Sequence, residues 1–179
     1  MRRAISTASN GEIEYPLAAS VGAAIRITHR AFAQDLQAYL VRHHVTVGMW
    51  FFLRTLWEED GLTQRELSRR VGTMESTTVQ QLRKMELQGL IERRRSTIDR
   101  RKVHVHLTGA ARGLRAQLLP YAEEVNRAAL AGLTPHEVAA LKQTLTRIRA
   151  NLQARQVARE NAPTPVITRR GTNSARKRR

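Results

Sequence analysis

The fold is decided by residues 62–108, which read LTQRELSRRVGTMESTTVQQLRKMELQGLIERRRSTIDRRKVHVHLT. The stretch opens with a Thr-Gln-Arg-Glu capping box at residues 63–66, in which the threonine hydroxyl and the glutamate carboxylate accept free backbone N–H groups at a helix start. This short helix is expected to end near Gly72, and a second to run from about 74 to 88 and stop at Gly89. Two short helices separated by Val-Gly-Thr have the spacing of a helix-turn-helix.

The end of the same stretch predicts a β-hairpin. Residues 102–107 alternate Lys and His with Val and Leu, which is the pattern of a half-buried strand. Residues 90–96 supply the other strand, and the polar segment 97–101 forms the turn between them.

On the N-terminal side, two helices are expected to precede the capping box. Apolar residues from Leu17 to Leu40 recur every three or four positions, so this segment is a long amphipathic helix. Residues 46–59 are apolar on almost every side, which places that helix at the centre of the fold.

On the C-terminal side, two more helices follow the hairpin. Thr108 caps the first, and Pro120 within it is expected to bend or break it. A second capping box at 134–137 begins the last helix, whose apolar seam continues to Leu152.

The apolar stripes of the first and last helices are too long for the central unit to cover. We therefore expect these two helices to pack on each other and on a second copy of the chain, as a symmetric homodimer.

The composition points to a polyanionic partner. The chain has 179 residues, with 31 Lys and Arg against 15 Asp and Glu, which gives a net charge of +16. Six of these basic residues lie in the last eleven positions, and without them the net charge is still +10. A surplus of this size attracts nucleic acid.

Several classes of function are excluded or disfavoured. The chain has no cysteine, which excludes disulfides, thiolate catalysis and cysteine-ligated zinc. No catalytic, phosphate-loop or metal-binding motif is found, so we expect no enzyme, cofactor or metal site. The sequence has neither an apolar run of membrane-spanning length nor a secretory signal, and a cytoplasmic, nucleoid-associated protein without a membrane partner is expected.

The second helix of the helix-turn-helix has two contrasting sides. At 100° per residue, Thr78, Val79, Leu82 and Met85 are expected to face the core. The other side and its edges carry short hydroxyls, a long amide and a lysine, contributed by Thr73, Ser76, Thr77, Gln80 and Lys84. Such groups suit the base edges of a DNA major groove, although an ordinary solvated helix face has a similar composition.

The predicted hairpin is rich in arginine. Eight basic and three acidic residues lie between 83 and 102. Arginines on such a loop, here Arg95, Arg100 and Arg101, can enter a minor groove, while the alternative is a solvated rim. Asp99 opposes DNA affinity by its charge, and we interpret it as holding a neighbouring arginine in one rotamer.

Residues 62–108 resemble the MarR (multiple antibiotic resistance regulator) family of winged helix-turn-helix proteins, through the D-x-R wing signature at 99–101 and the strand that ends in Leu-Thr at 107–108. The resemblance implies a dimer joined by its first and last helices, a recognition helix in the major groove and the wing arginine Arg101 in the minor groove. The chain departs from the usual pattern at Met74, Glu75 and Thr78, so base preferences are not carried over.

The expected fold is mainly α with a small β-hairpin wing. Its expected segments are an arm (residues 1–14), a dimerisation helix (15–45), a DNA-binding lobe (46–108), further dimerisation helices (109–156) and a basic disordered tail (157–179).

Many members of the family respond to small aromatic acids, which raises the question of a ligand site in this chain. Trp50 and Arg54 lie four residues apart on the central helix, so an aromatic plane and a guanidinium share one face and suit a planar carboxylate. His29 and His43 are further candidates. The alternatives are that Trp50 belongs to the core and that Arg54 pairs with an acid.

Two functions follow from these patterns. The first is a sequence-specific regulator of double-stranded DNA, which the resemblance implies to be a repressor of a catabolic or efflux operon, bound to a pseudo-palindrome and released by an aromatic effector such as a hydroxybenzoate or hydroxynicotinate. The second is an architectural, ligand-independent DNA-binding protein, which would bind all duplexes alike.

Overall fold

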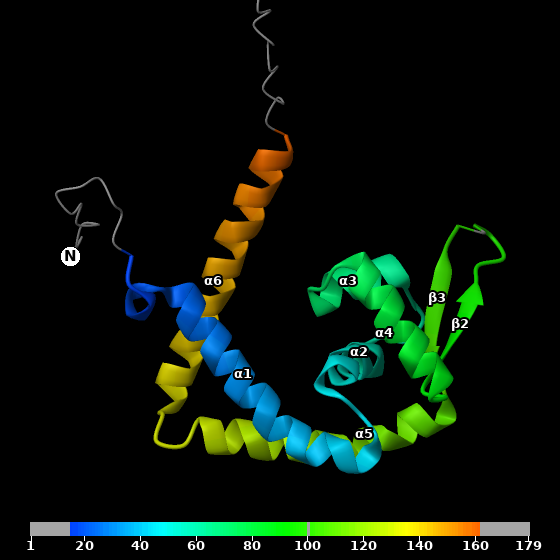
Figure 1. Ribbon diagram of the computed structural model, residues 1–179, viewed down its shortest axis with the longest axis horizontal. Helices are drawn as coiled ribbons and strands as arrows, with labels where there is room; N and C mark the ends of the chain where they lie inside the picture. The colour runs from blue at the N-terminus through cyan, green and yellow to red at the C-terminus, as the bar shows by residue number, and fades with distance from the viewer. Residues whose placement is uncertain (1–14, 100, 162–179) are drawn as a thin grey trace, which may run out of the picture. The chain divides into compact units, whose positions relative to one another are not determined.

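The computed structural model describes residues 15–99 and 101–161, in two compact units that divide between Ala131 and Gly132. The first unit is mostly helical and carries a small antiparallel sheet (Figure 1). Its elements are two single-turn 3-10 helices, Leu17–Ala19 and Val41–His43, with α1 (Val21–Leu40), α2 (Val47–Glu58), β1 (Leu62–Thr63), α3 (Gln64–Val71), α4 (Glu75–Leu87), β2 (Ile91–Arg95), β3 (Val103–Leu107) and α5 (Gly109–Ala129). The predicted helical fold with a hairpin wing is confirmed.

Side-chain caps set where most of these helices begin. Both expected capping boxes are formed, since Thr63 Oγ1 accepts the N–H of Glu66 while the Glu66 carboxylate accepts the N–H of Thr63 at 2.9 Å, and the box at 134–137 repeats the pattern. Helix α1 begins at Val21, later than the apolar repeat that starts at Leu17, because the Ser20 hydroxyl caps it by accepting the N–H of Ala23.

The wing belongs to a three-stranded antiparallel sheet with the order β1-β3-β2. Ile91 pairs with Leu107 at the base of the hairpin and Arg95 pairs with Val103 near its tip. The sequence did not predict β1, because a strand of two residues has no periodicity to detect. It pairs Leu62 with Val105 and so joins the start of α3 to the wing.

The core of the first unit lies among α2, α3, α4, α5 and the sheet. Each of these elements contributes side chains that are at most 2% exposed, namely Leu53, Leu56, Leu67, Leu82, Met85, Ile91, Val105 and Leu118. Truncating one such leucine to alanine typically costs about 2–5 kcal/mol of stability. The all-round apolar helix is central as expected, although Phe51 on it is 39% exposed.

Pro120 does not break its helix, so of the two expected outcomes, a bend or a break, the break is wrong. Helix α5 is continuous from Gly109 to Ala129. The proline is exposed, as is Ala116 one turn earlier. The carbonyl that loses its usual N–H partner therefore lies on the exposed side of the helix, where water can replace that partner.

The second unit contains α6 (Pro135–Glu160). Its apolar residues Leu141, Leu145 and Leu152 are between 40% and 62% exposed. None of the helices within residues 15–99 and 101–161 combines the length and the apolar character that crossing a membrane requires.

Candidate nucleic-acid interface

Helix α4 presents a polar face opposite its buried one. Thr78, Leu82 and Met85 are at most 1% exposed and pack against the core. The predicted contact residues of this helix are exposed, namely Ser76, Thr77, Gln80 and Lys84, and Thr73 in the preceding turn is half-buried.

Val79 was expected in the core, and this expectation is wrong, since its side chain is 45% exposed. It follows Thr78 by 100° around the helix and so leaves the narrow buried arc. Arg83, which follows it by one turn, is also exposed. This places a methyl-bearing and a cationic side chain beside the face that sequence analysis assigned to DNA.

The angle between α3 and α4 is fixed by a short turn. Ser68 is 3% exposed, and its hydroxyl donates to the carbonyl of Thr73 at 2.7 Å. The N–H of Thr73 in turn donates to the carbonyl of Ser68 at 3.1 Å. Gly72 adopts φ = 75°, a left-handed conformation that favours glycine. These contacts define the turn that sets where α4 begins after α3.

Only some of the wing arginines are free to meet a ligand. Arg93 pairs with Glu86 of α4 through a 2.9 Å hydrogen bond, and Arg94 pairs with Glu92 at 2.8 Å. The Arg93 contact, above all other causes, holds the pKa of Glu86 below its usual value. Arg95 and Arg101 are exposed, and neither forms an ion pair with any acid of residues 15–99 or 101–161.

Asp99 shapes the wing turn through hydrogen bonds to the backbone. It forms no ion pair with an arginine among the described residues. Its Oδ1 accepts the backbone N–H of Arg101 at 3.1 Å, and its carbonyl accepts the N–H of Lys102 at 2.8 Å. Among the described residues Asp99 therefore restrains the backbone of Arg101, while the expected restraint on the rotamer of a neighbouring arginine stays a prediction. Arg100 lies outside the described residues.

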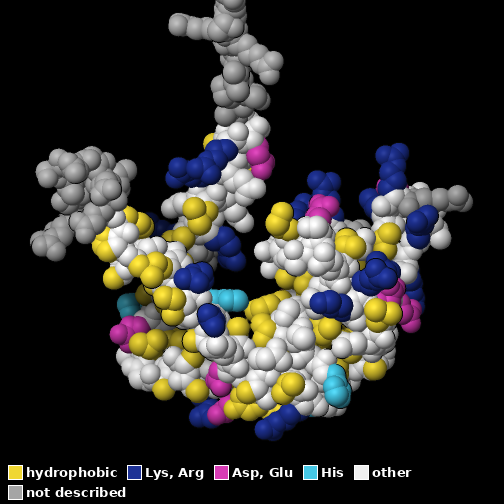
Figure 2. All heavy atoms as spheres, in the orientation of Figure 1, with side chains coloured by type: hydrophobic (Ala, Val, Ile, Leu, Met, Phe, Trp, Pro, Cys, Tyr) yellow, Lys and Arg dark blue, Asp and Glu magenta, His cyan; other side chains and the backbone are white. Residues whose placement is uncertain are grey.

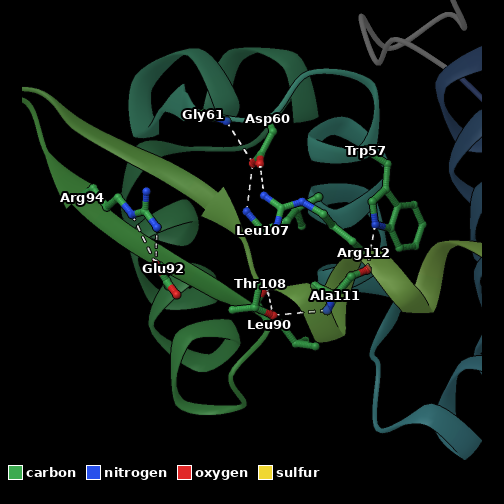
Figure 3. A network of polar contacts seen from close by, with 10 residues as sticks. All are labelled: Trp57, Asp60, Gly61, Leu90, Glu92, Arg94, Leu107, Thr108, Ala111 and Arg112. Atoms are coloured by element: carbon green, nitrogen blue, oxygen red, sulfur yellow. Dashed lines mark hydrogen bonds and ion pairs between the residues drawn. The ribbon is translucent and has the colours of Figure 1, made fainter.

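A network of polar contacts anchors the wing to the rest of the unit (Figure 3). The Asp60 carboxylate accepts N–H groups from Leu107 at 2.9 Å and Gly61 at 3.0 Å, and pairs with Arg112 at 2.7 Å. Burial alone would raise the pKa of Asp60, but the hydrogen bonds from Leu107, Arg112 and Gly61 outweigh it and hold the pKa below its usual value. The network thus joins the end of α2, the end of β3 and the start of α5.

Two further contacts strengthen the same junction. Trp57 Nε1 donates to the carbonyl of Ala111 at 3.0 Å in the buried interior. Thr108 caps α5 through its hydroxyl, which also donates to the carbonyl of Gly89 at 2.7 Å. The wing root is therefore tied to both α2 and α5.

Basic side chains that the sequence analysis did not select lie beside the interface. Figure 2 shows lysines and arginines gathered over α3 and the wing. Arg65 and Arg69 of α3 and Arg101 and Lys102 of the wing line one polar groove. The spacing of four between the two α3 arginines, which places them on one helix face, was a signal that could have found them.

A second feature, a cavity of about 250 Å³, lies between α1, α2 and α5 and brings together two of the four predicted ligand residues. His29 and Trp50 line it, together with Phe32, Leu36 and Phe51. Arg54 is not part of the lining and pairs with Glu58 at 3.3 Å, which is the alternative left open above. His43 lies elsewhere, with its ring centroid 5.8 Å from that of Tyr121.

The fold and the α4–wing surface define the class of protein as a winged helix DNA-binding protein. The model of the MarR family matches residues 45–103. Over 134 residues, the chain is 31% identical to the HTH-type transcriptional regulator TtmR of Methylorubrum extorquens (strain PA1), covering 74% of this chain and 67% of that protein. The chain belongs to the MarR family of DNA-binding transcriptional regulators, and its relatives are regulators, not enzymes.

Solved structures agree with this assignment. The transcriptional regulator PA3341 is 34% identical, with a TM-score of 0.68 over 75% of this chain and 99% of that one. BpsR of Bordetella bronchiseptica shares the fold, with a TM-score of 0.66 at 22% identity over 72% of this chain and 98% of that one.

Proposed function

We propose that this regulator is a homodimeric repressor that binds a pseudo-palindromic operator in double-stranded DNA and leaves it when a small aromatic effector binds. The observation that carries the proposal is the pairing of an exposed hydroxyl and amide face on α4 with a wing whose Arg95 and Arg101 have no described acidic partner. A bidentate amide such as that of Gln80 suits adenine in the major groove, and an unpaired arginine suits the electronegative minor groove.

Exposed apolar side chains support the dimer. Val21 and Ile25 of α1 are 58% and 39% exposed, and Leu145 and Leu152 of α6 are 40% and 62% exposed. Val21 and Ile25 lie one turn apart on α1, and Leu145 and Leu152 lie two turns apart on α6, so each helix carries an apolar stripe of a kind that is rarely left open to water. A two-fold pair would cover both helices and set two copies of α4 about one helical turn of DNA apart.

The cavity between α1, α2 and α5 supports regulation by a ligand. It lies within the same unit as α4, and Trp50, Val47 and Phe51 on its wall come from α2. Helix α2 also contacts α4, since Gly48 lies against the side chain of Gln81. BpsR offers a parallel, because its DNA binding is regulated by 6-hydroxynicotinic acid.

Selection from a pool of random duplexes, at about 0.15 M salt, tests the proposal. The expected result is enrichment of an inverted repeat with half-sites about 10 base pairs apart, bound by two chains, and a lower transcript yield from a promoter overlapping it. Equal retention of all duplexes would instead identify the architectural alternative. A monomer in sedimentation equilibrium would contradict the two-fold arrangement.

A further inference from the structure

We infer that Ile98, at the tip of the wing, is an apolar wedge, a side chain that inserts between base pairs in the minor groove and kinks the operator at a flexible base step. The inference rests on the proposed function, because it adds a contact and a bend to the complex between the same wing and the same DNA. It makes Ile98 a specificity-determining residue that senses how easily the duplex deforms, with no hydrogen bond to a base edge.

The position of Ile98 distinguishes it from other exposed apolar residues. Its side chain is 98% exposed, the highest value among the large apolar side chains of residues 15–99 and 101–161. Exposure alone assigns no role, since single apolar side chains are common on protein surfaces. Ile98, however, lies in the loop that joins β2 to β3 at the outer end of the wing (Figure 1), between the exposed arginines Arg95 and Arg101. Attraction that draws these arginines into the minor groove therefore brings Ile98 there as well.

Hydrogen bonds hold the backbone of the loop that presents Ile98. The Ser96 hydroxyl accepts the N–H of Ile98 at 3.2 Å and the N–H of Asp99 at 3.1 Å. The N–H of Ser96 donates to the carbonyl of Lys102 at 2.9 Å, which closes the loop. Isoleucine is branched at Cβ, so its χ1 angle has few alternatives. Both restraints reduce the conformational entropy that is lost when the side chain becomes buried in a complex.

A DNA duplex can bury such a side chain. Proteins that bind the minor groove insert isoleucine and similar apolar residues between base pairs, unstack them in part and kink the duplex by roughly 20–90°. Burial of the apolar surface of Ile98 offsets the cost of unstacking, which is lowest at pyrimidine–purine steps such as TA and CA. We therefore expect the operator to carry such a step where each wing tip meets the minor groove.

The test begins with the shape of the selected operator in its complex with the full-length protein. Energy transfer between fluorophores at the two ends of the operator should show a bend of at least about 20° for each wing. 2-Aminopurine, placed in turn at each candidate step, should gain fluorescence at the step that is unstacked. An operator that is bound but stays straight would overturn the inference and leave the proposed function intact, because operator selection requires no bend.

Ile98→Ser removes the apolar side chain without changing the charge of the wing. The variant should fold as the parent does, since this side chain is almost fully exposed. We expect its affinity for the operator to fall by about tenfold and its bend to decrease, while the slope of log K against log salt stays the same. Ile98→Leu, which keeps an apolar side chain, should retain the bend and most of the affinity.

A change in the DNA completes the test. Replacement of the flexible step by a stiff AA step should weaken binding of the parent protein and have little effect on Ile98→Ser, since only the parent must open that step. A bend and a step preference that persist in Ile98→Ser would overturn the inference. If selection enriches no operator, the inference fails together with the proposed function.

Discussion

The carboxylate of Asp60, just beyond the end of α2, accepts a 2.9 Å hydrogen bond from the backbone N–H of Leu107, which lies 47 residues further along the chain. The same carboxylate pairs with Arg112 near the start of α5. One side chain therefore holds the base of the wing to the end of α2 and the start of α5.

Asp60→Asn is expected to lower the free energy of unfolding by about 1–2 kcal/mol at pH 7, because hydrogen bonds to a charged group are replaced by weaker ones. The pKa of Asp60 is lower in the folded protein than its usual value of 3.8. Its stabilising contribution is therefore present above that value and is lost as the pH falls through the lower, folded pKa. Urea unfolding between pH 5 and pH 2 should show a shallower pH dependence in the variant.

The matched control for Asp60 is Glu58→Gln, whose carboxylate is 68% exposed and pairs with the partly exposed Arg54. Exposed pairs of this kind contribute little to stability. Equal losses in the two variants would contradict the role given to the Asp60 network.

Thr78→Val is expected to raise the free energy of unfolding by about 1 kcal/mol. Thr78 is 1% exposed, and its hydroxyl has no hydrogen-bond partner among the described residues. Valine has nearly the same shape and removes the unsatisfied hydroxyl. Thr77→Val, at an exposed position of the same helix, serves as the control and should change stability by only a few tenths of a kcal/mol. Destabilisation by Thr78→Val would show that the hydroxyl has a partner.

Arg101→Ala should weaken binding to the selected operator without dissociating the dimer, and should reduce the slope of log K against log salt by about 1. Arg94→Ala is the matched control, because Arg94 lies on the same hairpin but is paired with Glu92. We expect it to have the smaller effect in fluorescence anisotropy across a salt series. Unchanged binding by Arg101→Ala would refute the assignment of the wing.

Gln80→Ala is expected to reduce discrimination among operator variants by about 1–3 kcal/mol at one base pair of each half-site. Gln88→Ala, at the C-terminal cap of the same helix, should leave the preferred sequence unchanged. Competition between the selected operator and single-base variants measures both effects. An unaltered base preference in Gln80→Ala would exclude Gln80 from base contact.

The elements with a local signal could be predicted from the sequence. Both capping boxes and the alternation at Val103–Leu107 depend on neighbours within a few residues, and the structure contains all three. Strand β1 could not be predicted, since two residues become a strand only through their partners Val105 and His104. Helix α5 is continuous through Pro120 because the proline lies on the side of the helix that faces solvent, and the local sequence pattern does not indicate which side that is.

The candidate ligand residues show the same limit. A spacing of four correctly places Trp50 and Arg54 near one another on α2, but only packing decides that Trp50 joins a cavity with His29 of α1 while Arg54 turns to Glu58. Residues on different helices meet through the crossing of those helices, and no spacing within one helix encodes it.

The sequence by itself determined the order of the helices, the helix-turn-helix, the hairpin, the basic surplus and the resemblance to a family, because each follows from local periodicity, caps or composition. Only the tertiary structure decided which wing arginines are neutralised by acids, that Asp60 anchors the wing, and that an apolar cavity without a cation opens beside His29. Those properties depend on distances between residues far apart in the chain, which are set when the core packs.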